Sequence, residues 1–253
     1  MQTPGFLSTP LIRTFLFALL TSSLLASLLA VKSLFHLQIV PHLLQQHQLH
    51  RLLTFQSVYT NSGELLFSTL LLYQLRLLER IFGSRKFLSC ILYTGAVTSL
   101  LCPAILLLGW WLTAGRWNYL PPGPTPVIFA LLAQYHAAVP GIYKFSILLP
   151  GGVGEVGGSD KLYAYLLALQ LAACQLPGSA VAASVGWLVG YAWRLEMLPR
   201  TRWRVGRGVV AMLGGEGEAR EFEVLRRRLR GEVGAERQGG PIVWRVLDQF
   251  RGR

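Results

Sequence analysis

The stretch YQLRLLERIFGSRKF, Tyr73 to Phe87, decides how this sequence folds. It begins inside the apolar block Leu65–Leu75 and ends at the start of the apolar block Phe87–Leu112. Between the two blocks lie the basic residues of the stretch and Gly83. An abrupt change from an apolar run to a glycine-containing basic turn and back is typical of two helices that meet at one side of a membrane.

Other apolar blocks extend this pattern over most of the chain. Of the 253 residues, 52% are hydrophobic and only 14% are charged, whereas about a quarter of a soluble domain is charged. Residues 14–31 form an uncharged run long enough to nearly cross a bilayer, and longer than the apolar core of most signal peptides. A retained span is therefore preferred there, with a cleaved signal peptide as the alternative. The remaining blocks are Leu65–Leu75, Phe87–Leu112, Pro126–Pro150, Leu162–Leu176 and Ser179–Trp193. The sequence predicts an all-α polytopic membrane protein with six helices.

Basic residues indicate how the predicted spans are oriented. The even-numbered loops and the tail hold most of the lysines and arginines, among them Arg85, Lys144 and Lys161. By the positive-inside rule both termini are expected to be cytosolic. Residues 1–198 form the predicted transmembrane domain, and 199–253 a basic tail that is partly helical or disordered. The net charge of +12 then reflects anchoring to the lipid bilayer and its anionic lipids, not binding to nucleic acid.

Motifs that could carry other chemistry are interpreted as structure. The glycines of GGVGEVGGSD fit a dinucleotide fingerprint in spacing only, because they join two apolar blocks instead of following a strand, and they predict a flexible cytosolic loop. Four histidines of the first long loop have no acidic residue or cysteine near them, which disfavours a metal site. Three single cysteines are expected to pack in the interior. We expect no metal and no cofactor. The histidines and cysteines are His36, His42, His47, His50, Cys90, Cys102 and Cys174.

Several motifs taken together resemble the rhomboid superfamily over roughly residues 10–195. Gly186 and Gly190 form a G-x-x-x-G pair, which lets a neighbouring helix come close. In rhomboids such a pair lies in the last span, an aromatic-Arg pair opens the first lumenal loop, and an E-R-x-x-G-S-x-[RK]-F-like turn follows the second span. The matching residues of this sequence, which the resemblance identifies as fold motifs, are Arg51 (after His50), Glu79, Arg80, Gly83, Gly186 and Gly190.

The same resemblance locates a degenerate active site. Active rhomboids have a G-x-S-[GA] motif at the start of the fourth span and a histidine three residues before the glycine pair. Here Thr125, within Gly123-Pro-Thr125-Pro126, replaces the serine, and Ala183 replaces the histidine. A hydroxyl needs a base to become a nucleophile, so the resemblance implies a pseudoprotease and no enzyme activity. The alternative is an intramembrane protease in which Thr125 acts with a displaced base, from His136 or the loop histidines.

Tyr73–Phe87 and the segment Gln238–Trp244 are most similar to a narrower group within the superfamily. This group comprises the ubiquitin-associated-domain-containing rhomboid-like proteins of the endoplasmic reticulum and the rhomboid-like subunit of the fungal Golgi Dsc ubiquitin ligase complex. It implies a scaffold that brings transmembrane clients to ubiquitin-ligase subunits and extraction machinery, in the endoplasmic reticulum or Golgi. Only nine residues follow Trp244, so no complete ubiquitin-associated domain is expected. A transporter is a weaker alternative, because few polar groups fall at mid-membrane.

Overall fold

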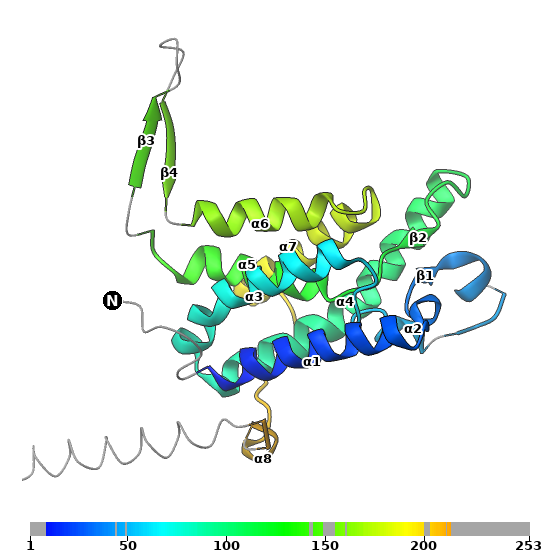
Figure 1. The fold of residues 1–253 in the computed structure, drawn as a ribbon, viewed down its shortest axis with the longest axis horizontal. Helices are drawn as coiled ribbons and strands as arrows, with labels where there is room; N and C mark the ends of the chain where they lie inside the picture. Colours follow the sequence, from blue (N-terminus) through cyan, green and yellow to red (C-terminus); the bar gives the residue numbers. More distant parts are fainter. Residues whose placement is uncertain are drawn as a thin grey trace, which may run out of the picture.

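Six helices of twelve residues or more pack side by side in the computed structural model (Figure 1). The structure describes residues 9–43, 45–48, 50–141, 144–148, 155–159, 161–199, 203–210 and 212–213. The six helices are α1 Pro10–Leu28, α3 Ser62–Phe82, α4 Ser84–Leu112, α5 Thr125–Ala138, α6 Leu162–Ala173 and α7 Gly178–Arg194. Each corresponds to one of the six predicted apolar blocks. The predicted helix in the tail and the segment 238–244 lie outside the described residues.

Shorter elements lie at the ends of these helices. They are η1 Lys32–Leu34, η2 Ile39–Leu43, α2 Arg51–Thr54 and α8 Arg207–Val210, with the strands β1 Leu37–Gln38, β2 Tyr119–Leu120, β3 Lys144–Leu148 and β4 Glu155–Ser159. β1 pairs antiparallel with β2, which ties the first long loop to the loop after α4. In Figure 1 this pair lies at one end of the molecule and the β3–β4 hairpin projects from the other. The fold is therefore mainly helical, and the all-α prediction is corrected by these two small sheets.

The predicted block Pro126–Pro150 is wrong as a single helix. α5 ends at Ala138, and Val139 is extended with φ −96° and ψ 118°. The reason is Pro140, which disfavours the α conformation in the residue before it and lacks an N–H. Lys144 therefore lies in a strand, not near the end of a membrane helix, and the predicted glycine loop contributes β4. The register of this hairpin runs from Lys144 opposite Ser159 to Leu148 opposite Glu155.

The stretch Tyr73–Phe87 forms the sharp junction between α3 and α4. Gly83 is both the last cap of α3 and the first cap of α4, and its φ of 75° lies in the region that favours glycine. Its N–H donates to the carbonyl of Glu79 at 2.8 Å, and its own carbonyl accepts from Phe87 N–H at 3.0 Å. At the other end of α3, the Asn61 side chain accepts from Gly63 N–H at 3.0 Å and caps the helix.

The core lies around α5, which contacts α3, α4, α6 and α7. Its largest fully buried side chains include Leu71, Leu75, Phe87, Ile128 and Leu131. By contrast, the outward faces carry exposed leucines and tryptophans. Examples are Leu100 at 67% exposure, Leu188 at 64% and Trp111 at 74%. An apolar exterior of this kind suits contact with lipid. Within the described residues, α1 and α4 are long and apolar enough to cross a membrane, and α6 is a shorter apolar helix.

Candidate functional site at the entrance between α5 and α7

The loop before α5 is held tightly against the segment that precedes α3. Gly123 N–H donates to the carbonyl of Phe55 at 2.6 Å. Gly123 has a φ of 145°, and a Cβ atom added there would lie 2.1 Å from Cε1 of Tyr59. Only glycine satisfies both the backbone angle and this close approach. The ring of Tyr59 is thereby placed beside the first turn of α5.

Thr125, the residue at the nucleophile position of the resemblance, is the first residue of α5 and is buried. Its Oγ1 lies 3.0 Å from the hydroxyl oxygen of Tyr59, and the two groups share a hydrogen bond. Burial raises the pKa of Tyr59 far above its usual value, partly offset by the hydrogen bond with Thr125. The phenol therefore stays protonated and cannot take a proton from the threonine. Pro124 and Pro126 flank Thr125 at the helix start, where a missing N–H costs least.

The glycine pair of α7 lies directly against the backbone of α5. A Cβ atom at Gly186 would fall 2.1 Å from the carbonyl oxygen of Pro126, and one at Gly190 would fall 2.4 Å from that of Ala130. The two contacts are four residues apart on both helices in the same direction, so α5 and α7 run parallel. Ala183 is buried and precedes Gly186 by about one turn. It is therefore placed toward the end of α5 that begins with Thr125.

Histidines lie away from this entrance. His136 follows Thr125 by eleven residues on α5, about 16 Å along the helix axis, and its Nδ1 lies 2.6 Å from the hydroxyl of Tyr165. His36 is half-buried next to the ring of Tyr119, with 6.1 Å between ring centroids, and His47 is exposed. Within the described part of the chain, no three His, Cys, Asp or Glu side chains are grouped so that they could hold a metal ion.

Polar side chains that sequence reasoning missed surround the same region. Gln134 is buried on α5, and its Nε2 donates to the carbonyl of Gly190 on α7. Glu64, in the first turn of α3, accepts from Nε2 of Gln175 at 3.0 Å. Gln175 Oε1 in turn accepts from the hydroxyl of Tyr119 at 3.3 Å. Burial, followed by the nearby carboxylate of Glu64, raises the pKa of Tyr119. The local sequence gives no sign of these bonds, because each joins segments far apart in the chain.

Two of the fold-motif residues hold the chain at opposite ends of the bundle. Arg51 is buried, and its Nη1 donates to the carbonyls of Ser33 at 3.1 Å and His36 at 2.9 Å. It therefore fastens the first long loop. Glu79 is 1% exposed and accepts from the backbone N–H groups of Leu11 at 2.9 Å and Ile12 at 2.8 Å.

This carboxylate caps the first turn of α1, where a negative charge is favoured by the helix dipole. Arg80 is half-buried in the last turn of α3. The segment after α7 returns to the same side of the bundle, because Val205 N–H donates to Ser89 Oγ on α4 at 3.0 Å. The turn between α3 and α4 thus lies in a region where the start of α1 and part of the tail are also fixed.

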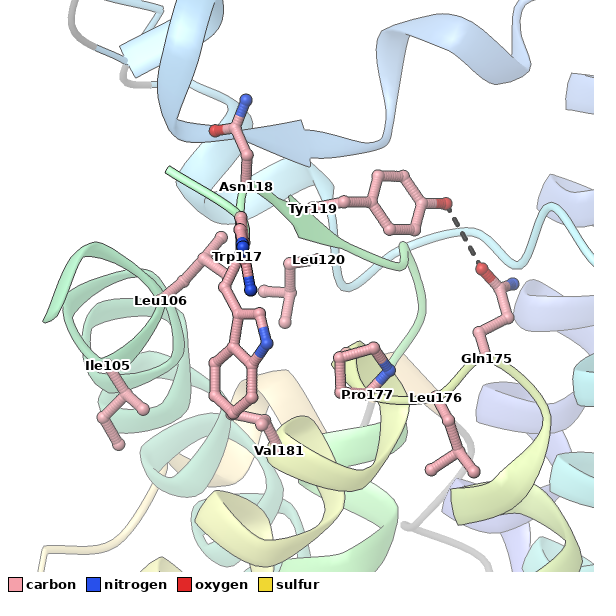
Figure 2. A pocket seen from close by; sticks show the side chains of 12 residues that line it. Ile105, Leu106, Trp117, Asn118, Tyr119, Leu120, Gln175, Leu176, Pro177 and Val181 are labelled. Atoms are coloured by element: carbon pink, nitrogen blue, oxygen red, sulfur yellow. Dashed lines mark hydrogen bonds between the residues drawn. The ribbon is translucent and has the colours of Figure 1, made fainter. Parts of the chain in front are cut away.

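Two cavities open beside this framework. One, of about 370 Å³, lies between α1 and the start of α3; Tyr59 and Lys32 are among its lining residues. The other, of about 450 Å³, lies between the end of α4, β2 and the turn from α6 to α7 (Figure 2). Tyr59 therefore faces a cavity and also contacts Thr125. The entrance itself is filled by side chains.

The chain is similar in sequence to several named eukaryotic proteins. It is 32% identical over 185 residues to DSC E3 ubiquitin ligase complex subunit 2 of Schizosaccharomyces pombe. The aligned region covers 73% of this chain and 48% of that protein. The chain is 28% identical over 153 residues to Rhomboid-like protein 18 of Arabidopsis thaliana, and the aligned region covers 60% of this chain and 50% of that protein. The human Ubiquitin-associated domain-containing protein 2 is 26% identical over 236 residues, covering 79% and 66%.

The chain thus spans about half the length of the first two relatives. No solved structure matches it. The names of these relatives confirm the resemblance to rhomboid-like proteins that the sequence motifs indicated. Residues 13–196 match the family described as Eukaryotic integral membrane protein (DUF1751). That range includes all six long helices except the first residues of α1, and the chain belongs to this family of eukaryotic integral membrane proteins.

Proposed function

We propose that the chain is a non-catalytic rhomboid-like subunit of a membrane ubiquitin ligase. In this role it recognises transmembrane clients in the endoplasmic reticulum or Golgi and brings them to ligase subunits and extraction machinery. The six helices span the bilayer with both termini in the cytosol, and residues 199–253 continue as a basic cytosolic tail. The similarity to a subunit of the DSC E3 ubiquitin ligase complex supports the ligase part of this proposal.

The observation that carries the non-catalytic part is the hydrogen bond between Thr125 and Tyr59. Acyl transfer by a hydroxyl requires a neighbouring base and donors aimed at the developing oxyanion. The partner of Thr125 is a phenol whose pKa is raised by burial, Ala183 offers no acceptor, and Pro126 offers no N–H. The entrance is thus built as a packing contact. Thr125 and Ala183 are the degenerate active-site positions of a pseudoprotease.

Complementation with a Thr125 variant tests the proposal. In cells that lack the chain, we would follow the half-life and ubiquitin modification of a membrane reporter whose span carries a polar residue. Restoring the wild-type chain should shorten the half-life, and Thr125→Val, which keeps the shape but removes the hydroxyl, should restore turnover equally well. A reporter that is degraded without ubiquitin modification, or whose cleavage fragments vanish with Thr125→Val, would establish the protease alternative instead.

Association with the ligase is tested separately. The full chain, purified from membranes in mild detergent, should retain a ubiquitin ligase subunit in a fixed ratio. Gly186→Leu serves as the unfolded control, since its side chain cannot fit against Pro126. A folded wild-type preparation that consistently lacks ligase subunits would contradict the proposal.

A further inference from the structure

The cavity of about 450 Å³ at the end of α4 has a pre-formed wall. Trp117 packs its ring over Gly109, where a Cβ atom would lie 2.9 Å from Cε3 of the indole. On the opposite side, Gly178 is so close to Pro121 that a Cβ atom would lie 2.6 Å from its Cδ. Both glycines hold loop segments tightly against helices, so the space between them is fixed by backbone packing. Its volume is in the range of small-molecule sites.

Apolar side chains dominate the surface of this cavity. Figure 2 shows Trp117, Ile105 and Leu106 facing Leu176 and Pro177 across it. Two polar side chains at its edge, Asn118 and Tyr119, are already bonded. The Asn118 side-chain oxygen accepts from the backbone N–H groups of Ile39 and Val40 in η2, both at 3.0 Å, and the hydroxyl of Tyr119 donates to Gln175. A ligand in this cavity therefore gains little from hydrogen bonds and must be mostly apolar.

The mouth of the cavity continues along the outside of α4. Ile105 lines it and is 38% exposed, and the residues that share its helix face are also exposed. They follow the i, i+4, i+7, i+11 spacing of one apolar stripe, which comprises Leu101, Ile105, Leu108 and Leu112. In an integral membrane protein an exposed stripe of this kind faces acyl chains. The cavity therefore opens toward lipid.

One positive charge lies at the rim. Arg116 lines the cavity and is exposed, and its guanidinium has no hydrogen-bond or ion-pair partner among the residues that the structure describes. Two tryptophans are close by, Trp111 at 74% exposure and Trp117 at 41%. Tryptophan and arginine together are typical of the level of phospholipid headgroups. A guanidinium is also well shaped to bind phosphate oxygens.

From these observations we propose that the cavity binds one acyl chain of a membrane phospholipid, with the lipid phosphate on Arg116. The acyl chain enters between Ile105 and Leu176, and the remainder of the lipid lies along the stripe of α4. The site is separate from the entrance at Thr125 and does not depend on any ligase function.

Photolabelling with two probes tests both parts of the site. The full chain would be reconstituted in phosphatidylcholine vesicles that contain either a phosphatidylcholine with a diazirine at the end of one acyl chain or a long-chain alcohol with the same diazirine. After irradiation, labelled peptides are identified by mass spectrometry. Labelling should be concentrated on the end of α4 and on residues 175–181, above the level on other lipid-facing helices.

Val181→Phe should reduce labelling of the cavity severalfold with both probes, because the larger ring occupies the space. Leu188→Phe, on an exposed position of the same helix, is the matched control and should leave labelling unchanged. Should Val181→Phe unfold in a thermal melt, Ile105→Trp narrows the mouth instead, with Leu100→Trp, at an exposed position of α4 outside the stripe, as its control. Labelling that is spread evenly over the helices, or that ignores these substitutions, would overturn the proposal.

Arg116→Glu tests whether the phosphate of the lipid headgroup contributes to binding in addition to the acyl chain. An arginine near a phosphate contributes about 1 kcal/mol, so phospholipid labelling should fall about five-fold while labelling by the alcohol stays the same. Arg194→Glu, at an exposed arginine at the other end of α7, is the charge control. If Arg116→Glu changed labelling by the phospholipid and by the alcohol equally, Arg116 would not bind the lipid phosphate. A photoreactive residue at Leu176 that captures protein in native membranes, and no lipid, would assign the cavity to a protein segment.

Discussion

The Cβ atom that any other residue would carry at Gly186 falls 2.1 Å from the carbonyl oxygen of Pro126. The obstacle is backbone and not the end of a flexible side chain, so α7 has to move away from α5 to accept even a methyl group. These two helices share the most extensive contact in the bundle. Close backbone contact of this kind is the main means by which helices associate in lipid.

Gly186→Ala should therefore destabilise the protein by about 1–3 kcal/mol, the usual cost of overpacking. The measurement is the midpoint of thermal unfolding in detergent. Gly95→Ala is the matched control, because a Cβ atom there meets its neighbours at an ordinary 3.7 Å and alanine is the better helix former. Gly95→Ala should leave the midpoint unchanged or raise it. Equal midpoints for Gly186→Ala and the wild type would contradict the close backbone contact between α5 and α7.

The carboxylate of Glu79 should be needed for the first turn of α1. Glu79→Gln keeps one acceptor but loses the charge, and Glu79→Ala loses both, so the free energy of opening that turn should fall in that order, by about 1–2 kcal/mol for alanine. Hydrogen exchange at Leu11 and Ile12 reports this directly. Exchange that is the same in all three proteins would show that another group caps α1.

The hydrogen bond between Tyr59 and Thr125 can be measured with a double-mutant cycle. Tyr59→Phe and Thr125→Val each remove one hydroxyl without changing the shape much. Each alone should destabilise the protein by about 1 kcal/mol, and the double variant should cost less than the sum of the two. Strict additivity of the three unfolding free energies would mean that the two hydroxyls are not coupled.

Arg51 should not be replaceable by lysine. Its Nη1 donates to the carbonyls of Ser33 and His36 while its Nε donates to the side-chain oxygen of Gln48. The single nitrogen of an ammonium cannot reproduce this two-nitrogen fork. Arg51→Lys should speed limited proteolysis in residues 29–50 severalfold. Lys32→Arg, in the same loop, is the control substitution. Unchanged proteolysis would mean that other contacts hold the loop.

The first long loop should also become less stable in acid. Burial, and then the positive charge of Arg51, lowers the pKa of His36 below the usual histidine value of about 6.5. The unfolded loop therefore takes up a proton as the pH falls through about 6.5, before the folded loop does, and stability decreases over that window. Proteolysis of the loop should be faster at pH 5.5 than at pH 7.5. His36→Gln should remove this dependence, whereas His47→Gln, at an exposed histidine, should keep it.

Helices were predictable from this sequence where an apolar run is long or ends at a glycine, as it does at Gly83. The error after Ala138 has a clear cause. Residues 139–150 are mostly apolar, and a short apolar run does not distinguish a strand from a helix. Pro140 was the signal that the helix had ended. The hairpin is set by pairing between β3 and β4, which composition does not reveal.

Some residues of the candidate site could be proposed from the sequence, and others could not. Thr125 and Ala183 could be proposed from the sequence because the motif around each is local in the chain. Tyr59 could not, because its hydroxyl meets Thr125 from 66 residues away. The same holds for the cap that Glu79 provides to Leu11, 68 residues away. Contacts between distant segments depend on how the helices pack, and one sequence does not encode them in any short pattern.

The single residue between α3 and α4 also constrains how the gene can change. Because Gly83 ends one helix and begins the next, this junction has no spare loop to absorb an added or lost codon. Inserting one residue would turn all of α4 by about 100° about its axis and shift it by about 1.5 Å, so that its apolar stripe would no longer face outward. We expect insertions and deletions to be selected against at this joint, and to be tolerated in the β3–β4 hairpin, which projects away from the bundle (Figure 1).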